Sequence, residues 1–387
     1  MLRFISFIMI LCLLLSSCGT SSPAPISSLS ADESQPEFDM PLEFNPSKGK
    51  LCKYHSVYYY EAMSWILYYD EETGTSGKLC NKPECTHEDI SCNAYIPGFG
   101  CLQIYDGMLY FMGSMGALYR MDLSGNQREF VMSVRMLNGA DGTWFIHRGY
   151  VYTSVFVNKV EKGEAAVNYS LCRYPLGTSA AKEMMFEKDF DQLITDAWMI
   201  RGNSLFLSFS QGLWGHRELY HYDLDTGELT ELISGSYSGS VSNFQLTEDG
   251  IVFAEKDKER IRITKYDFST GELKKLHEWN DADGYLSGLS ADQKLILFYN
   301  SYVRRDEDQW ISYRILESQE KGSEVFTGSI EGYTPLVRFY GSDETGFFLE
   351  KRIDAATENI NELWRISYDT GEAEMLIQFK RLNPNPQ

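Results

Sequence analysis

The sequence predicts an all-β fold, a β-propeller of repeated four-stranded sheets, and three observations support this prediction. Aromatic residues make up 14% of the 387 residues, and Tyr and Phe favour strands because their broad side chains pack well on a pleated surface. Glycine-containing turns recur every 44 to 52 residues along the chain. A second hairpin turn precedes most of them, so each repeat holds about four strands, as a propeller blade does.

The first residues predict export. The chain starts with Met1-Leu2-Arg3, an apolar run follows from Phe4 to Leu15, and the sequence up to Cys18 resembles the bacterial lipobox. The run is too short to span a bilayer about 30 Å thick. We therefore expect a lipoprotein signal peptide over residues 1–17 and lipidation of Cys18. The alternative is an ordinary signal peptide with a chance cysteine.

Lipidation would define where the protein is located. Several acyl chains hold a protein stably on a membrane. We expect an exported protein anchored to the outer face of the cytoplasmic membrane, or to the outer membrane if the organism has one. Ser, Pro and acidic residues dominate residues 18–39, which predicts a disordered tether after the lipidated cysteine. About 20 flexible residues span ~25 Å on average, enough to lift a domain clear of the headgroups.

The propeller is predicted over residues 40–380, followed by a C-terminal tail over residues 381–387. Ring closure is expected to involve the segment 40–44, which would pair with the last blade. Within the repeats, a strongly apolar strand follows one of the two hairpin turns. Such strands are predicted at Met108–Met112, Leu205–Phe209, Ile251–Ala254, Leu295–Tyr299 and Phe347–Leu349.

The turns share a motif that is clearest in the second half of the chain. Tyr222–Glu228 and Tyr266–Glu272 both read Y-D-x-x-T-G-E, and Ser367–Glu372 ends in the same T-G-E. A short loop with glycine at a positive φ is typical of β-hairpins. The glycines of the seven turns are residues 74, 125, 177, 227, 271, 322 and 371. They predict seven blades, with six or eight as alternatives because some repeats are irregular. A β-sandwich with coincidental turns is the competing fold.

The longer connections between strands are expected to gather on one face of the ring, opposite the hairpin turns. Loops that a rigid scaffold holds in place usually carry binding residues. An aromatic and arginine-rich rim suits stacking on sugar rings or contact with a protein partner. The residues predicted for this binding face are Trp144, Trp198, Trp214, Trp310, Arg304 and Arg305. The alternative is that the aromatic residues fill space between blades.

A cysteine-rich segment lies between the first two repeats. Cys80, Cys85, His87 and Cys92 follow the spacing C-x4-C-x-H-x4-C, and Cys101 comes nine residues later. Three thiols and an imidazole could surround a tetrahedral Zn²⁺, which favours sulfur and nitrogen ligands, so a structural zinc is one interpretation. Disulfides, which are common in exported proteins, are the second interpretation, and free thiols are the third.

The same segment carries a family resemblance. The run C-x-K-P-x-C-x-H, together with the lipobox and the repeats, resembles uncharacterised exported lipoproteins of Gram-positive bacteria that are grouped with TolB-like and lipoprotein-receptor-related β-propellers. The resemblance implies a surface propeller. It supplies no catalytic activity, because these families mainly bind partners. Six blades are common in such families, which differs from the seven turns counted here.

Charge and motifs restrict the function further. A net charge of −20 excludes nucleic acid and anionic membrane surfaces as partners bound through charge. No G-x-S-x-G, H-E-x-x-H or Walker motif occurs. We expect a lipid-anchored, non-catalytic module that binds a protein or glycan through its loop-rich face. The alternative is a glycan-active hydrolase or lyase that uses loop carboxylates from the segments 281–283 and 306–308.

Overall fold

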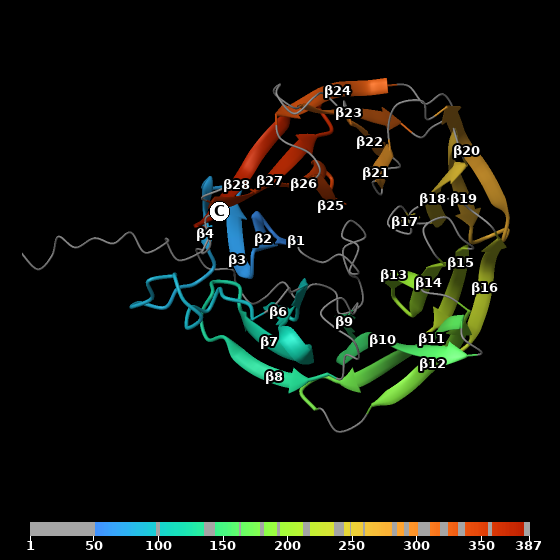
Figure 1. Cartoon of the computed structure of the whole chain (residues 1–387), viewed down its shortest axis with the longest axis horizontal. Helices are drawn as coiled ribbons and strands as arrows, with labels where there is room; N and C mark the ends of the chain where they lie inside the picture. Colours follow the sequence, from blue (N-terminus) through green and yellow to red (C-terminus); the bar gives the residue numbers. More distant parts are fainter. Residues whose placement is uncertain are drawn as a thin grey trace, which may run out of the picture.

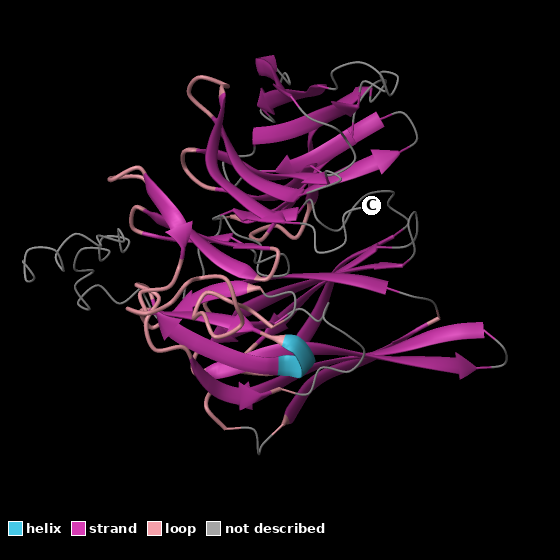
Figure 2. Ribbon diagram, turned by 60° about the vertical axis from the view of Figure 1, so that its left-hand side comes forward, coloured by secondary structure: helices cyan, strands magenta, loops and turns pink. Residues whose placement is uncertain are grey.

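The structure is a computed structural model that describes residues 51–97, 101–134, 144–161, 164–178, 182–191, 194–211, 217–235, 244–247, 249–257, 260–280, 285–289, 294–300, 310–317, 324–331, 337–354 and 358–382. The predicted signal peptide, Cys18, the tether and the segment 40–44 lie outside these residues. The regular secondary structure of the described chain is strand, apart from one short 3-10 helix, η2 (Ser114–Gly116) (Figure 2). Among the described residues, no helix has the length and apolar character needed to cross a membrane.

The strands group into four-stranded antiparallel sheets that follow the chain in order, here called sheets 1 to 7. Sheets 1 to 3 consist of β1 (Leu51–Tyr54), β2 (Val57–Ala62), β3 (Trp65–Asp70) and β4 (Thr75–Lys78); β5 (Leu102–Tyr105), β6 (Met108–Met112), β7 (Ala117–Asp122) and β8 (Glu129–Ser133); and β9 (Trp144–His147), β10 (Tyr150–Glu161), β11 (Glu164–Pro175) and β12 (Glu183–Phe190).

Sheets 4 to 7 repeat the same order of strands. They consist of β13 (Ile194–Arg201), β14 (Ser204–Gln211), β15 (Arg217–Asp223) and β16 (Leu229–Gly235); β17 (Phe244–Thr247), β18 (Gly250–Asp257), β19 (Arg260–Asp267) and β20 (Leu273–Asn280); β21 (Tyr285–Leu289), β22 (Lys294–Asn300), β23 (Trp310–Glu317) and β24 (Glu324–Glu331); and β25 (Val337–Ser342), β26 (Gly346–Asp354), β27 (Glu358–Ser367) and β28 (Ala373–Leu382).

The sheets are arranged around a common centre, with the first strand of each sheet near the middle and the last at the periphery (Figure 1). The predicted all-β class and the propeller of four-stranded sheets are therefore confirmed. The described residues form seven such sheets. The total number of blades in the ring stays a prediction. The last strand ends at Leu382, two residues into the predicted C-terminal tail.

The recurring turn motif is explained by hydrogen bonds within each turn. In the turn after β15, the Asp223 carboxylate accepts the backbone N–H groups of Asp225 (2.9 Å) and Thr226 (2.7 Å). Gly227 has φ +74°, a conformation that favours glycine, and its N–H donates to the Asp223 carbonyl. Asp267 accepts the equivalent bonds in the turn after β19. The motif therefore encodes a hairpin between the third and fourth strands.

The outer strands share an irregularity that the sequence did not predict. Leu118 pairs with Met132, but its neighbour Tyr119 pairs with Phe130, so β8 carries one extra residue, Val131. The same register shift between the third and fourth strands occurs in all of sheets 2 to 7. It is absent from the pairing of β3 with β4. Each shift is a β-bulge, which bends the strand locally.

The first and last sheets meet through buried polar contacts as well as apolar packing. The Tyr60 hydroxyl donates to Glu350 Oε1 (2.7 Å), and Asn361 Nδ2 donates to the same oxygen (2.5 Å). Tyr340 donates to the other oxygen of this carboxylate. All four residues are buried. This contact between sheets 1 and 7, here called the closing seam, joins parts of the chain about 290 residues apart.

Candidate metal centre

The cysteine-rich segment forms the connection between β4 and β5, here called the Cys loop (residues 79–97). It lies on the outside of the ring, beside sheets 1 and 2 (Figure 1). Backbone hydrogen bonds tie it to the hairpin between β2 and β3: Ile66 N–H donates to the Ala94 carbonyl (2.8 Å), and Ile96 N–H donates to the Ser64 carbonyl (2.8 Å). The loop is therefore fixed to sheet 1 through main-chain contacts that do not depend on its side chains.

Sheet 2 holds the other side of the Cys loop. The Arg128 guanidinium donates to the carbonyls of Tyr95 (2.6 Å), Cys92 (3.0 Å) and Ile90 (3.3 Å). The Gly125 carbonyl accepts hydrogen bonds from Asn81 N–H (3.3 Å) and from the side chain of Asn93 (3.0 Å). Two neighbouring sheets therefore determine the shape of the loop.

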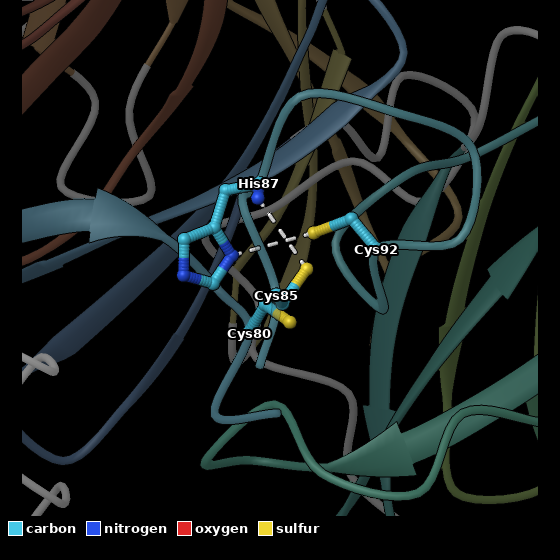
Figure 3. A group of neighbouring side chains, drawn as sticks. All are labelled: Cys80, Cys85, His87 and Cys92. Carbon is cyan, nitrogen blue, oxygen red and sulfur yellow. Dashed lines mark hydrogen bonds between the residues drawn. The ribbon is translucent and has the colours of Figure 1, made fainter. Parts of the chain in front are cut away.

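Within this frame, the side chains of Cys80, Cys85, His87 and Cys92 point toward one another (Figure 3). Their ligand atoms all lie within 4.8 Å of one another. Cys92 Sγ is 3.6 Å from His87 Nδ1. In a tetrahedral zinc site with usual Zn–S and Zn–N bond lengths, a sulfur and a nitrogen ligand are also about 3.6 Å apart. The geometry fits a four-coordinate Cys₃His zinc site with His87 bound through Nδ1.

A backbone N–H group points at one of the sulfurs: His87 N–H donates a hydrogen bond to Cys85 Sγ. The backbone amides of Lys82 and Ala94 favour the thiolate forms of Cys80 and Cys92. The distance from His87 N to Cys85 Sγ is 3.4 Å. Donors of this kind stabilise thiolates, which are the form that binds a metal. The backbone around the cysteines therefore supplies hydrogen-bond donors to the sulfur cluster.

The pKa values of Cys80 and Cys92 indicate how readily the two neighbouring thiols form thiolates. Burial favours the neutral thiol at Cys80, but the hydrogen bonds that it accepts lower its pKa overall. Burial raises the pKa of Cys92 to about 12, and the neighbouring Cys80 adds to this increase. Once one thiolate has formed, a second one beside it is unfavourable unless a cation is present. A divalent metal ion would remove this repulsion.

His87 is held in the form that binds a metal. Burial lowers the pKa of its imidazole, and the nearby positive charge of Lys78 lowers it further. The ring is therefore neutral at pH 7, with a lone pair available on one nitrogen. Lys78 also donates a hydrogen bond to the His87 carbonyl, which fixes the residue from the side of sheet 1.

The remaining cysteines lie outside this cluster. The prediction that Cys101 joins the other four residues is wrong: Cys101 directly precedes β5, and its half-buried side chain packs against the apolar core between sheets 2 and 3. Cys172 is buried in the same core. None of the six cysteines in the described part of the chain forms a disulfide. Of the interpretations left open by the sequence, the structure fits a metal site at Cys80, Cys85, His87 and Cys92.

Two of the tryptophans predicted for the binding face belong to the core instead. Trp144 is 3% exposed and Trp198 is 0% exposed, and Trp198 packs edge-on against Phe145 with ring centroids 5.3 Å apart. Both indoles fill space between sheets because each lies on the first strand of its sheet, where neighbouring sheets converge. The side chain of Trp310 and the residues Trp214, Arg304 and Arg305 lie outside the described part of the structure, as do the carboxylates of segments 281–283 and 306–308.

No protein-family profile and no curated protein sequence match this chain. Solved structures do match. A prolyl endopeptidase is 13% identical, with a TM-score of 0.53 over 88% of this chain and 52% of that one. TolB from Acinetobacter baumannii is 14% identical, with a TM-score of 0.38 over 87% of this chain and 79% of that one. An oligogalacturonate lyase in complex with manganese is 11% identical, with a TM-score of 0.44 over 88% of each chain.

At these identities the similarity concerns the fold alone. The prolyl endopeptidase has the propeller fold that the sheets of this chain also form. This chain spans about half the length of that peptidase. The similarity therefore agrees with the propeller and transfers no activity to the present protein.

Proposed function

We propose that the protein is an exported, lipid-anchored β-propeller that acts as a non-catalytic binding module, and that its Cys loop folds around a structural zinc ion. The observation that carries this proposal is the convergence of four protein ligands from one loop. Structural zinc sites have four protein ligands, whereas catalytic sites keep one position for water or substrate. A Cys₃His set therefore supports a metal that shapes the loop and takes no part in a reaction.

The zinc site gives a direct prediction. The full chain, expressed with zinc and dialysed, retains one Zn²⁺ per molecule, because three thiolates and an imidazole hold the ion together. Cys92→Ser lowers the retained zinc at least tenfold. Cys101→Ser is the matched control and retains the metal, since Cys101 lies outside the cluster. Metal analysis and thiol titration measure both results. A loss of two free thiols without bound metal would show a disulfide instead.

The ring supports binding because it displays its connections on a rigid scaffold. Ile90 on the Cys loop has a side chain that is 70% exposed. It is an apolar group that a bound protein or glycan would cover. With a net charge of −20, the partner is a protein or glycan and not a nucleic acid.

Two measurements test the binding function and the anchor. Glycan arrays and pull-downs with the full chain in detergent should identify a ligand. Cleavage of a glycan without stable binding would instead support the alternative, a hydrolase or lyase that uses loop carboxylates. Membrane fractionation compares the full chain with Cys18→Ala. The variant should leave the membrane fraction, because it lacks the lipid.

A further inference from the structure

The proposed zinc ligands are part of the apolar core of the closing seam. Cys80, Cys92 and Ala94 of the Cys loop belong to the same buried cluster as Leu363 and Phe379 of sheet 7. All of these residues are at most 8% exposed. The metal centre therefore does not stand apart on the surface, and its two inner sulfurs contact the region where the ring closes.

Lys78 provides a second connection between the metal centre and the seam. It ends strand β4, and its ammonium donates a hydrogen bond to the carbonyl of the ligand residue His87. The same ammonium lies 3.9 Å above the ring of Trp65 and 5.4 Å from that of Phe379. One positive charge thus contacts a zinc ligand, sheet 1 and the last strand of the chain.

Aromatic contacts complete this junction. The rings of Trp65 and Phe379 are 6.5 Å apart, and Trp65 also packs edge-on against Tyr95 of the Cys loop, at 5.5 Å. Phe379 belongs to β28, which lies beside β3 and β4 (Figure 1). The Cys loop, sheet 1 and β28 therefore meet at a single aromatic and cationic contact.

We propose that the metal fastens the ring: occupation of the Cys80–Cys85–His87–Cys92 site stabilises the contact between the first and last sheets. This inference rests on the proposed zinc site. Consecutive sheets are joined by the chain itself, whereas sheets 1 and 7 meet only through side-chain contacts among the described residues. A bound metal ion would order the Cys loop, which contributes Cys80, Cys92 and Ala94 to the seam. Because the ligands are in place only in the folded loop, the free energy of metal binding would stabilise the folded seam.

Hydrogen exchange of the zinc-loaded and zinc-free full chain tests the inference. Removal of zinc should speed amide exchange at least tenfold in β3 and β28, while exchange in β14 and β15 of sheet 4 stays within twofold. Faster exchange that is confined to the Cys loop would overturn the proposal and leave the zinc site intact. A uniform increase in all sheets would overturn it as well. If the chain binds no zinc, the proposed metal site itself fails.

If the zinc-free chain unfolds, the Lys78→Met variant provides a second test of the contact between the metal centre and β28. Lys78→Met approximately preserves the length of the side chain and leaves all four ligands in place. Because Lys78 also contacts His87, the zinc content of the variant is measured in parallel and exchange is compared in the zinc-saturated chain. Exchange in β28 should still rise at least threefold, because the cationic link to Phe379 is lost. Lys265→Met is the matched control, since Lys265 forms an ion pair on sheet 5 with Asp249, far along the chain from the seam. Unchanged exchange in β28 of the zinc-loaded Lys78→Met chain contradicts the proposal.

Discussion

Gly125→Ala is expected to destabilise the zinc-loaded chain by about 3–5 kcal/mol, through steric overlap and an unfavourable backbone conformation together. Gly125 has φ +84°, and a Cβ there would lie 2.7 Å from the carbonyl carbon of Leu79 and 2.8 Å from the nitrogen of Cys80. Both are backbone atoms and cannot rotate away. The added methyl group would push the Cys loop off sheet 2, so zinc affinity should fall with stability. Chemical denaturation and a zinc competition assay measure the two effects.

Gly107→Ala separates the two causes. Gly107 also has a positive φ, +66°, but a Cβ added there meets no atom within 4 Å. This variant should lose only about 1–2 kcal/mol, the cost of the left-handed conformation for a residue with a side chain. Equal losses for the two variants would show that the close approach of the Cys loop to Gly125 contributes nothing.

Glu350→Ala is expected to destabilise the chain by about 3–5 kcal/mol, because it removes the acceptor of three buried donors and leaves a cavity. The donors are Tyr60, Tyr340 and Asn361, and they come from both sides of the closing seam. Glu350 is 5% exposed, so water cannot easily replace the lost carboxylate. The free energy of unfolding from urea titration measures the loss.

An exposed glutamate on the same sheet is the control. Glu344 forms an ion pair with Lys53 at 3.1 Å, but its side chain is 65% exposed. Glu344→Ala should change stability by less than about 1 kcal/mol, since water screens a surface ion pair. Glu350→Gln keeps one acceptor oxygen and should be milder than Glu350→Ala. If Glu350→Ala is no worse than Glu344→Ala, the buried network does not hold the seam.

The repeated turns could be predicted from sequence because their physics is local. The Asp223 carboxylate and Gly227 act within a few residues of each other, so the motif alone identifies the hairpin. The metal ligands were partly predictable for the same reason, since Cys80, Cys85, His87 and Cys92 fall within one short segment.

The supporting contacts of the metal centre could not be predicted, because they come from elsewhere in the fold. Arg128 and Gly125 lie more than 30 residues beyond the ligands, and no motif connects them to the cysteines. Cys101 was assigned to the cluster on proximity in sequence, but the start of β5 directs it into another core. The prediction that Trp144 and Trp198 lie on the binding face was wrong, since both are buried. The sequence does not distinguish an aromatic rim from aromatic packing between sheets.

The bulges in the outer strands have a consequence for how copies of this protein behave when crowded. The fourth strand is the outer edge of each sheet. An unpaired strand edge is a template for aggregation by edge-to-edge pairing. The extra residue, such as Val131 in β8, breaks the even spacing of the outward N–H and C=O groups. Two molecules that meet edge to edge therefore cannot form a continuous ladder. The same bulge recurs in sheets 2 to 7, so the outer strand of each of these sheets carries an irregularity of the kind that disfavours edge-to-edge pairing between molecules.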